Sequence, residues 1–268
     1  MANDFSTDES CKALWRFESG AFTTDSIGTN TLTNDGADEA TGEGQYKEGS
    51  CAADFEFGNT DCMYRSDANL SAGFPFKNGD SVKKISLAFW VKWESIPADN
   101  TRYVISKYHT VGKRSFAIVT LADLTCNFYN GYNNGDSYEV KEIFTPSTGR
   151  FYHMGISLDG IAKTLNVRLW DDIAESANSF ALNLDNQTNV EDADFVLGDR
   201  GQRDGTYCFD GILDEVAVFN RCLTDDEFDA IRTETYAGWK PDEMCSTSIV
   251  DAAAWGGSAN HNRSFLVF

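Results

Sequence analysis

Hydrophobic and polar residues alternate along several short stretches of the chain, and a period of two is typical of β-strands with one buried face. The alternation is found in residues 86–93, 103–107, 115–121, 125–129, 150–158, 164–170, 194–198 and 211–219. Turn-forming residues separate these stretches at intervals of roughly ten residues. This pattern predicts an all-β fold, an antiparallel β-sandwich of the jelly-roll kind.

Two turn signals join neighbouring stretches into hairpins. The sequence Asn133-Asn134-Gly135-Asp136 predicts a tight turn, because asparagine and glycine accept the positive φ that a two-residue hairpin loop requires. Asp159-Gly160 predicts a second turn, between 150–158 and 164–170. Each pair of stretches is therefore expected to be antiparallel.

One short helix is predicted after the last strand. Thr224 and Glu227 have the spacing of a capping box, in which each side chain binds the backbone N–H of the other residue. Gly238 stands where a helix would stop. A partial apolar face is supplied by Phe228, Ile231 and Tyr236. These signals predict a helix over 224–236.

The composition is that of a packed and strongly acidic protein. Hydrophobic residues make up 41% of the 268 positions and aromatic residues 13%, which excludes general disorder. The 22 Lys and Arg and the 42 Asp and Glu give a formal net charge of −20, which argues against nucleic-acid binding. No apolar run approaches the length of a membrane span, so membrane insertion is not expected. The seven cysteines contain no CxxC pair, which argues against zinc and favours mostly reduced thiols.

Changes in composition divide the chain into an N-terminal arm (1–10), a β domain (11–238) and a C-terminal extension (239–268). The start of the chain lacks the basic and apolar regions of a secretory signal, so we expect synthesis in the cytoplasm without a signal peptide. The extension is a candidate partner-binding tail, through strand addition to a neighbouring subunit. The assembly residues would be Phe265, Leu266, Val267 and Phe268.

Several separated motifs occur in an order that is familiar from one family. They are Trp15-Arg16-Phe17-Glu18, Asp25-Ser26-Ile27-Gly28, Tyr46 to Phe55, Ile85 to Val91, and Phe209 to Thr224. The last, FDGILDEVAVFNRCLT, resembles the ending F-x-G-x-[IL]-D-E-V-x-[IVF]-[YF]-N-R-x-L-[ST] of laminin-G-like domains. The resemblance covers roughly residues 11–238. It implies a concanavalin A-like jelly roll, here with one short C-terminal helix.

The resemblance also implies a structural Ca²⁺ where the first and last strands meet. Asp214 would supply a carboxylate ligand, and Glu18 is a weaker candidate. Backbone carbonyls would complete the oxygen cage near Arg16, Gly49 and Ser50. In the alternative interpretation, Asp214 only caps backbone N–H groups at a sheet edge.

Two segments combine aromatic rings with polar side chains, as sugar-binding sites do. The first, on the predicted hairpin, contains Tyr129, Tyr132, Asn133, Asn134 and Tyr138. The second, around a glycine-containing loop, contains Arg200, Arg203 and Tyr207. Glycan binding is one interpretation. The other is that strands are rich in tyrosine and loops in asparagine for structural reasons.

A glycosidase would need two carboxylates on one strand face. Asp192 and Asp194 have the right spacing, but they read more simply as part of a solvated acidic loop. Asp171, Asp172 and Glu175 lack the E-x-D-x-x-E signature of laminarinase-like enzymes. The three histidines, His109, His153 and His261, are dispersed. Enzymatic activity is therefore not expected.

These observations favour a non-catalytic surface or structural protein. The laminin-G-like resemblance is to the single-module kind encoded among bacteriophage and prophage structural genes. It implies a virion component, such as a capsid decoration or a tail or fibre protein. The expected partners are further copies of the chain or other particle subunits. A surface glycan is a further candidate partner. The alternatives are a free-standing carbohydrate-binding module and a cryptic glycosidase.

Overall fold

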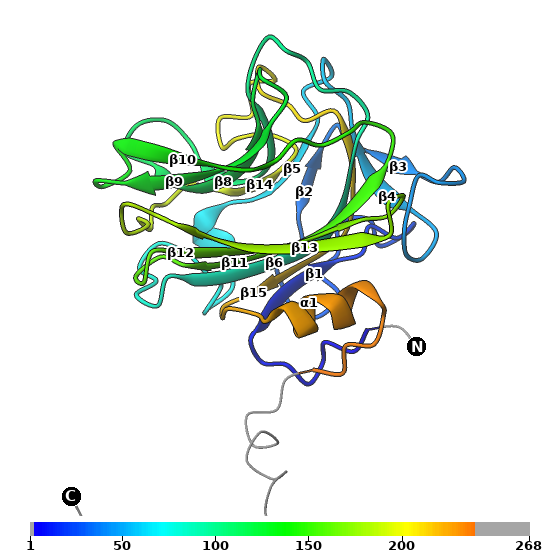
Figure 1. Ribbon diagram of the computed structural model, residues 1–268, viewed down its shortest axis with the longest axis horizontal. Helices are drawn as coiled ribbons and strands as arrows, with labels where there is room; N and C mark the ends of the chain where they lie inside the picture. The colour runs from blue at the N-terminus through cyan, green and yellow to red at the C-terminus, as the bar shows by residue number, and fades with distance from the viewer. Residues whose placement is uncertain (1–2, 239–268) are drawn as a thin grey trace, which may run out of the picture.

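The computed structural model describes residues 3–238, which form two antiparallel sheets packed face to face (Figure 1). In sheet I the neighbours follow the order β13 (Ser176–Asn183), β12 (Thr164–Asp171), β11 (Phe151–Asp159), β6 (Lys84–Trp93), β15 (Gly211–Phe219), β4 (Ala52–Phe55) and β3 (Asp38–Ala40), and β1 (Cys11–Trp15) also pairs with β15. In sheet II the order is β10 (Ser137–Phe144), β9 (Cys126–Tyr132), β8 (Arg114–Thr120), β7 (Arg102–Tyr108), β14 (Phe195–Leu197), β5 (Cys62–Arg65) and β2 (Thr33–Asp35). A short 3₁₀ turn, η1, covers Asp67–Asn69. The predicted sandwich is confirmed.

The predicted strands and hairpins are also confirmed. Each of the eight alternating stretches overlaps a strand of the structure. The turn at 133–136 joins β9 to β10, with Ser137 opposite Tyr132, and the turn after Asp159 joins β11 to β12. The short or exposed strands β2, β3 and β13 carry little apolar alternation, and for that reason the pattern does not show them.

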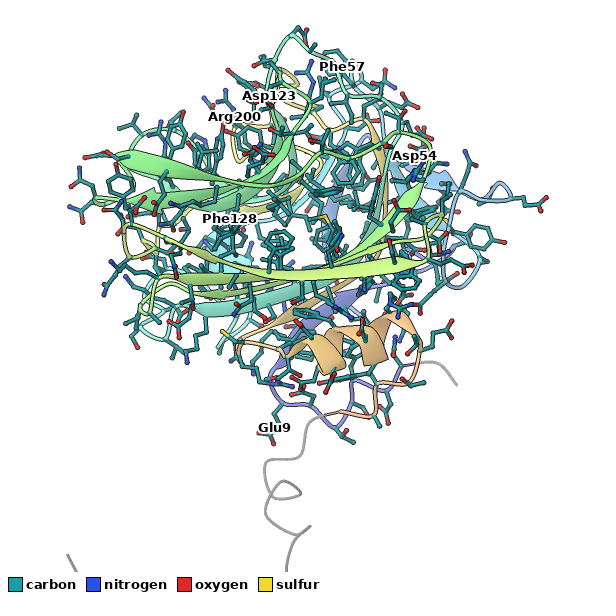
Figure 2. The ribbon with its side chains drawn as sticks, viewed as in Figure 1. Glu9, Asp54, Phe57, Asp123, Phe128 and Arg200 are labelled. Carbon is teal, nitrogen blue, oxygen red and sulfur yellow. The ribbon has the colours of Figure 1, made fainter. Side chains whose placement is uncertain are left out.

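The core lies between the sheets and takes every second residue of each central strand. Sheet I contributes Phe89, Met154 and Val167, and sheet II contributes Phe116, Phe128 and Phe195. Figure 2 shows Phe128 in this interior. The alternate residues of the same strands form the two outer faces of the sandwich, where the sites described below lie.

Helix α1 (Asp225–Arg232) lies on the outer face of sheet I (Figure 1). Thr224 and Glu227 form the predicted capping box. The helix is shorter than the predicted range 224–236, since it ends at Arg232 and Glu234 has a positive φ of 55°. Tertiary contact explains this end, because the chain then turns and the Tyr236 N–H donates to the side chain of Asn3 across 3.1 Å.

The first residues of the chain pack under this helix. Phe5 is buried against Phe219 and Tyr236, with ring centroids 6.0 and 5.2 Å away. The backbone N–H of Asp4 donates to the Tyr236 carbonyl across 2.8 Å. Residues 3–10 therefore belong to the folded unit, although the composition separates 1–10 as an arm.

Two further observations concern residues 3–238. The six cysteines in this range are free thiols, and five of them are buried. No helix in this range is long and apolar enough to span a bilayer. The predicted assembly residues, Phe265 to Phe268, lie outside the described residues.

Candidate functional site

Two cavities, of about 410 and 350 Å³, lie on opposite faces of the sandwich. The cavity of about 350 Å³ lies on the outer face of sheet II and is lined by tyrosines. Tyrosine rings come from β7, β9 and β10 and from the loop before β15. Those lining the cavity are Tyr103, Tyr108, Tyr129, Tyr138 and Tyr207. The polar lining residues are Asn100, Thr101, His109, Thr110, Arg114 and Arg200.

Small residues in the sheet leave room for these rings. Tyr129 stands opposite Ala117 on β8, and Tyr138 stands opposite Gly131 on β9. A Cβ at Gly131 would lie 2.1 Å from the Arg114 carbonyl oxygen, so a side chain there would force the strands apart. The tyrosine rings can therefore lie over the sheet and contact one another.

The rings form one continuous aromatic wall. Tyr129 and Tyr138 stack with centroids 4.8 Å apart, and Tyr108 meets Tyr138 edge-on at 6.1 Å. Tyr103 contacts both Tyr129 and Tyr207 edge-on, at 6.2 and 6.0 Å. These ring contacts hold the tyrosines against one another.

Two arginines lie over this wall. The guanidinium carbon of Arg200 is 3.7 Å from the ring centroid of Tyr207, and that of Arg114 is 5.2 Å from that of Tyr138. Figure 2 shows Arg200 on the side of sheet II that faces away from sheet I. Arg200 also pairs with the half-exposed Asp204 at 3.2 Å, a contact that solvent weakens. The cavity therefore has flat apolar surfaces and positively charged donors beside them.

Burial sets the protonation states in this cavity. It raises the pKa of Tyr103, Tyr108 and Tyr129, so their hydroxyl groups stay protonated at neutral pH. Burial, together with Lys113 and Arg200, lowers the pKa of His109. Tyr138, 43% exposed, is the most accessible ring, and it lies beside neutral hydroxyl groups and arginine cations.

The structure brings four of the eight predicted glycan residues together, namely Tyr129, Tyr138, Arg200 and Tyr207. The other four lie outside the lining. Tyr132, Asn133 and Asn134 form the end of the β9–β10 hairpin. Arg203 instead pairs with Asp194 at 2.5 Å and lies over Tyr64 at 3.8 Å.

Sequence reasoning missed Tyr103 and Tyr108 because they are five residues apart. In a regular strand an odd separation puts two side chains on opposite faces. Register irregularities after Tyr103 and before Tyr108 bring both rings to the outer face. Arg114 and His109 were missed as well, and only their closeness to two tyrosine-rich stretches could have indicated them.

The comparisons with known proteins agree with this architecture. A family profile, Laminin_G_3, described as the concanavalin A-like lectin/glucanases superfamily, matches residues 66–228, which is more than half of the chain. The chain belongs to the concanavalin A-like lectin/glucanases superfamily. No curated protein matches its sequence.

Solved structures share the fold of this superfamily member at low sequence identity. A binding domain of botulinum neurotoxin DC in complex with SialylT has a TM-score of 0.59 and 8% identity, over 85% of this chain and 52% of that one. Trypanosoma rangeli sialidase has a TM-score of 0.56 and 10% identity, over 85% and 33%. The enzymatically active domain of bacteriophage CBA120 tailspike protein 2 has a TM-score of 0.52 and 11% identity, over 88% and 32%. The chain thus spans about half or less of the length of these proteins.

The predicted calcium residues of this superfamily member do lie together, but their oxygens already have donors. Asp214 Oδ2 accepts from the backbone N–H groups of Lys47 and Glu48, at 2.7 and 3.1 Å, and Oδ1 accepts from that of Glu215 at 2.9 Å. Glu18 accepts from the backbone N–H of Ser50, which follows Gly49, at 3.1 Å and from its hydroxyl at 2.7 Å.

A cation is already present beside these carboxylates. Arg16 pairs with Glu215 at 2.8 Å. A calcium site needs six to eight oxygens facing the ion. Asp214 and Glu18 accept from N–H groups here, and the guanidinium faces the neighbouring Glu215. The contacts match the alternative in which Asp214 caps backbone N–H groups, and calcium binding stays a prediction.

Another group of carboxylates in residues 3–238 could offer ligands to a metal. One oxygen each of Asp54, Glu56 and Glu94 lies within 4.8 Å of the others. Burial, together with the neighbouring Glu94, Glu56 and Asp210 carboxylates, raises the pKa of Asp54 to about 6. These carboxylates therefore repel one another when all are ionised.

The carboxylates considered for glycoside hydrolysis are paired with cations. Asp192 lies 3.0 Å from Lys113, and Asp194 lies 2.5 Å from Arg203. Asp171 accepts from the backbone of Ala174 and pairs with Arg150 at 3.1 Å. These contacts give each carboxylate a structural role at a loop or a strand end.

Proposed function

We propose that the chain is a glycan-binding domain and that the tyrosine-lined cavity of sheet II holds the sugar. The observation that carries the proposal is the convergence of five tyrosine rings and two arginines in a cavity of about 350 Å³. Sugar rings have apolar C–H faces that stack on aromatic rings, while their hydroxyl groups need polar partners at the edges. The aromatic wall and the surrounding polar side chains supply both.

The charge of the cavity favours an acidic sugar. Within the described residues, the lining of this cavity contains no Asp or Glu, although the chain carries 42 of them. Arg114 and Arg200 present guanidinium groups, which bind planar anions such as carboxylates through paired N–H donors. A glycan that carries a carboxylate or sulfate should therefore bind more tightly than a neutral glycan.

The comparisons with solved structures support the fold on which this proposal depends. One similar structure is a neurotoxin binding domain in complex with SialylT, and another is a sialidase. Identities of 8% and 10% show the shared fold alone, so the ligands of those proteins do not identify the ligand here. The argument for an acidic glycan rests on the cavity's own residues.

Glycan-array binding followed by calorimetric titration tests the proposal. We expect Arg200→Gln and Tyr207→Ala each to weaken binding of an acidic glycan by about tenfold or more, because each removes a partner within the cavity. Arg203→Gln and Tyr132→Ala are matched controls, since both residues lie outside the lining. Equal losses in the controls, or no loss in the cavity variants, would contradict the proposal.

We further propose that the chain acts without catalysis, as part of a particle surface such as a virion. The support is the motif resemblance together with the cation pairing of Asp192 and Asp194. Light scattering of the native protein should give a discrete oligomer, and incubation with the bound glycan should release no product. A monomer would contradict the assembly role, and turnover would contradict the non-catalytic role.

A further inference from the structure

A second cavity, of about 410 Å³, lies on the opposite side of the sandwich, at the outer face of sheet I. Its lining comes from the loop before β4, from β6 and β12, from the turn before β13, and from the end of α1. The residues are Lys47, Glu48, Trp90, Trp170, Asp172, Glu175, Arg232 and Glu234. None of them belongs to the tyrosine-lined cavity, so a ligand here would not compete with a glycan there.

Strand register builds one wall of this cavity from two indoles. Trp90 on β6 stands opposite His153 on β11, and His153 stands opposite Trp170 on β12. The rings of Trp90 and His153 are 5.0 Å apart and meet edge-on. Burial lowers the pKa of His153 to about 3, so this residue is neutral at physiological pH. The row Trp90–His153–Trp170 is thus a rigid aromatic surface without its own charge.

Both indoles already bind cations from the chain. The ammonium nitrogen of Lys47 is 4.8 Å from the ring centroid of Trp90, and the guanidinium carbon of Arg232 is 3.9 Å from that of Trp170. Lys47 is also held by Asp172 at 2.9 Å. Each indole thus has a cation of the chain beside it, and an added cation would share or displace these contacts.

The cavity has more negative than positive groups. Four carboxyls line it against two cations, and in the described chain neither Glu175 nor Glu234 has an ion-pair partner. Glu48 and Asp172 line the same cavity, so like charges gather around it. An added cation would relieve this repulsion.

We propose that the indole cavity binds a small organic cation bearing ammonium groups, such as a diamine. The aromatic surface would contact the ligand's methylene groups and ammonium ends, and the carboxylates of Glu175 and Glu234 would neutralise its charge. An alkali or alkaline-earth ion would use the carboxylates without the indoles. A neutral sugar would leave the excess of negative charge uncompensated.

Titration of the full chain with diaminobutane tests this proposal. Tryptophan fluorescence and calorimetry measure the binding. Butanediol is the neutral match in length and shape. We expect saturable binding of the diamine and none of the diol. The paired variant Glu175→Gln/Glu234→Gln, at two exposed positions, should weaken binding by about fivefold or more, and so should Trp170→Leu, which keeps the charge of the chain.

The controls separate a built site from general attraction to an acidic protein. Glu142 is exposed on β10, the edge strand of sheet II, and Glu142→Gln changes the net charge without touching the cavity. We expect Glu142→Gln and Arg200→Gln to leave diamine binding unchanged. Equal weakening by Glu142→Gln, unchanged binding in the Glu175→Gln/Glu234→Gln variant, or equal binding of the diol would each overturn the proposal.

Discussion

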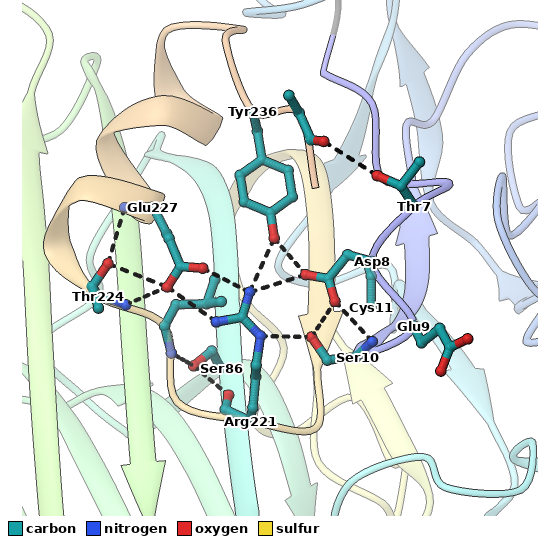
Figure 3. A network of polar contacts seen from close by, with 12 residues as sticks. Thr7, Asp8, Glu9, Ser10, Cys11, Ser86, Arg221, Thr224, Glu227 and Tyr236 are labelled. Atoms are coloured by element: carbon teal, nitrogen blue, oxygen red, sulfur yellow. Dashed lines mark hydrogen bonds and ion pairs between the residues drawn. The ribbon is translucent and has the colours of Figure 1, made fainter. Parts of the chain in front are cut away.

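The guanidinium of Arg221 donates to Asp8 Oδ2 across 3.0 Å and so ties the N-terminal segment to the end of β15 (Figure 3). The same guanidinium pairs with Glu227 of α1 at 2.7 Å. The Asp8 side chain is fully buried. Burial alone would raise the pKa of Asp8, but hydrogen bonds from Ser10, Tyr236 and Arg221 hold it below the ordinary value. One side chain therefore joins the N-terminal segment to the end of β15 and to the helix that follows it.

We expect Arg221→Met to lower the free energy of unfolding by about 2–4 kcal/mol, because it leaves the Asp8 carboxylate buried without its cation. Urea unfolding followed by circular dichroism measures this loss. Lys12→Met is the control, since the Lys12 ammonium donates to one backbone carbonyl at the surface. Lys12→Met should lower the free energy of unfolding less than Arg221→Met does. A loss below about 1 kcal/mol in Arg221→Met would argue against the stabilising role of this network.

The contact between α1 and sheet I depends on Gly155 of β11. A Cβ at this position would lie 2.4 Å from the Phe228 ring. We expect Gly155→Ala to cost about 1–3 kcal/mol, because the helix must move away from the sheet. Gly42→Ala is the comparison, since the added Cβ there would meet only the flexible side chain of Gln45. Thermal unfolding of both variants tests this expectation. Equal melting temperatures would contradict the close packing of α1 on Gly155.

The buried acids beside the indole cavity predict that stability falls as pH rises above neutrality. Burial raises the pKa of Glu48 and Asp214 to about 7 and that of Glu215 to about 8. In the unfolded chain these carboxyls are ionised well below pH 7, so the folded state binds more protons between about pH 7 and 8.5. The free energy of unfolding should therefore decrease over that interval.

Urea titrations at several pH values check this dependence. The window avoids the opposite effect of His153, whose lowered pKa makes the folded state bind fewer protons below about pH 6.5. Glu48→Gln should flatten part of the slope, because it removes one of the three titrating groups. A free energy of unfolding that rises from pH 7 to pH 8.5 would refute the prediction.

The hydrogen bonds of Asp214 lead to an expectation for metal removal. Since its oxygens accept from three backbone N–H groups, we expect EDTA and added Ca²⁺ to give melting temperatures within about 1 °C of each other. Differential scanning calorimetry of the native protein measures the difference. A clear rise with Ca²⁺ that EDTA reverses would mean that the ion displaces these donors and that the resemblance-based prediction of calcium is correct.

The local pattern of the sequence was sufficient for the central strands and the helix start of this fold. Alternation along 86–93, 150–158 and 164–170 reports one buried face, because neighbouring side chains of a strand point to opposite sides. The capping pair Thr224 and Glu227 marks the helix start, because the bonds that close it are local. The all-β sandwich with one helix follows from these short-range rules.

The tertiary structure alone decided where the proposed binding surfaces lie. Irregular register in β7 puts Tyr103 and Tyr108 on one face, and strand parity predicts the opposite. Lys47 lies beside Trp90 and Asp214 only because the loop before β4 folds over sheet I. Contacts between residues this far apart in the chain depend on how whole strands align and pack, and no local pattern of hydrophobic and polar positions encodes that alignment.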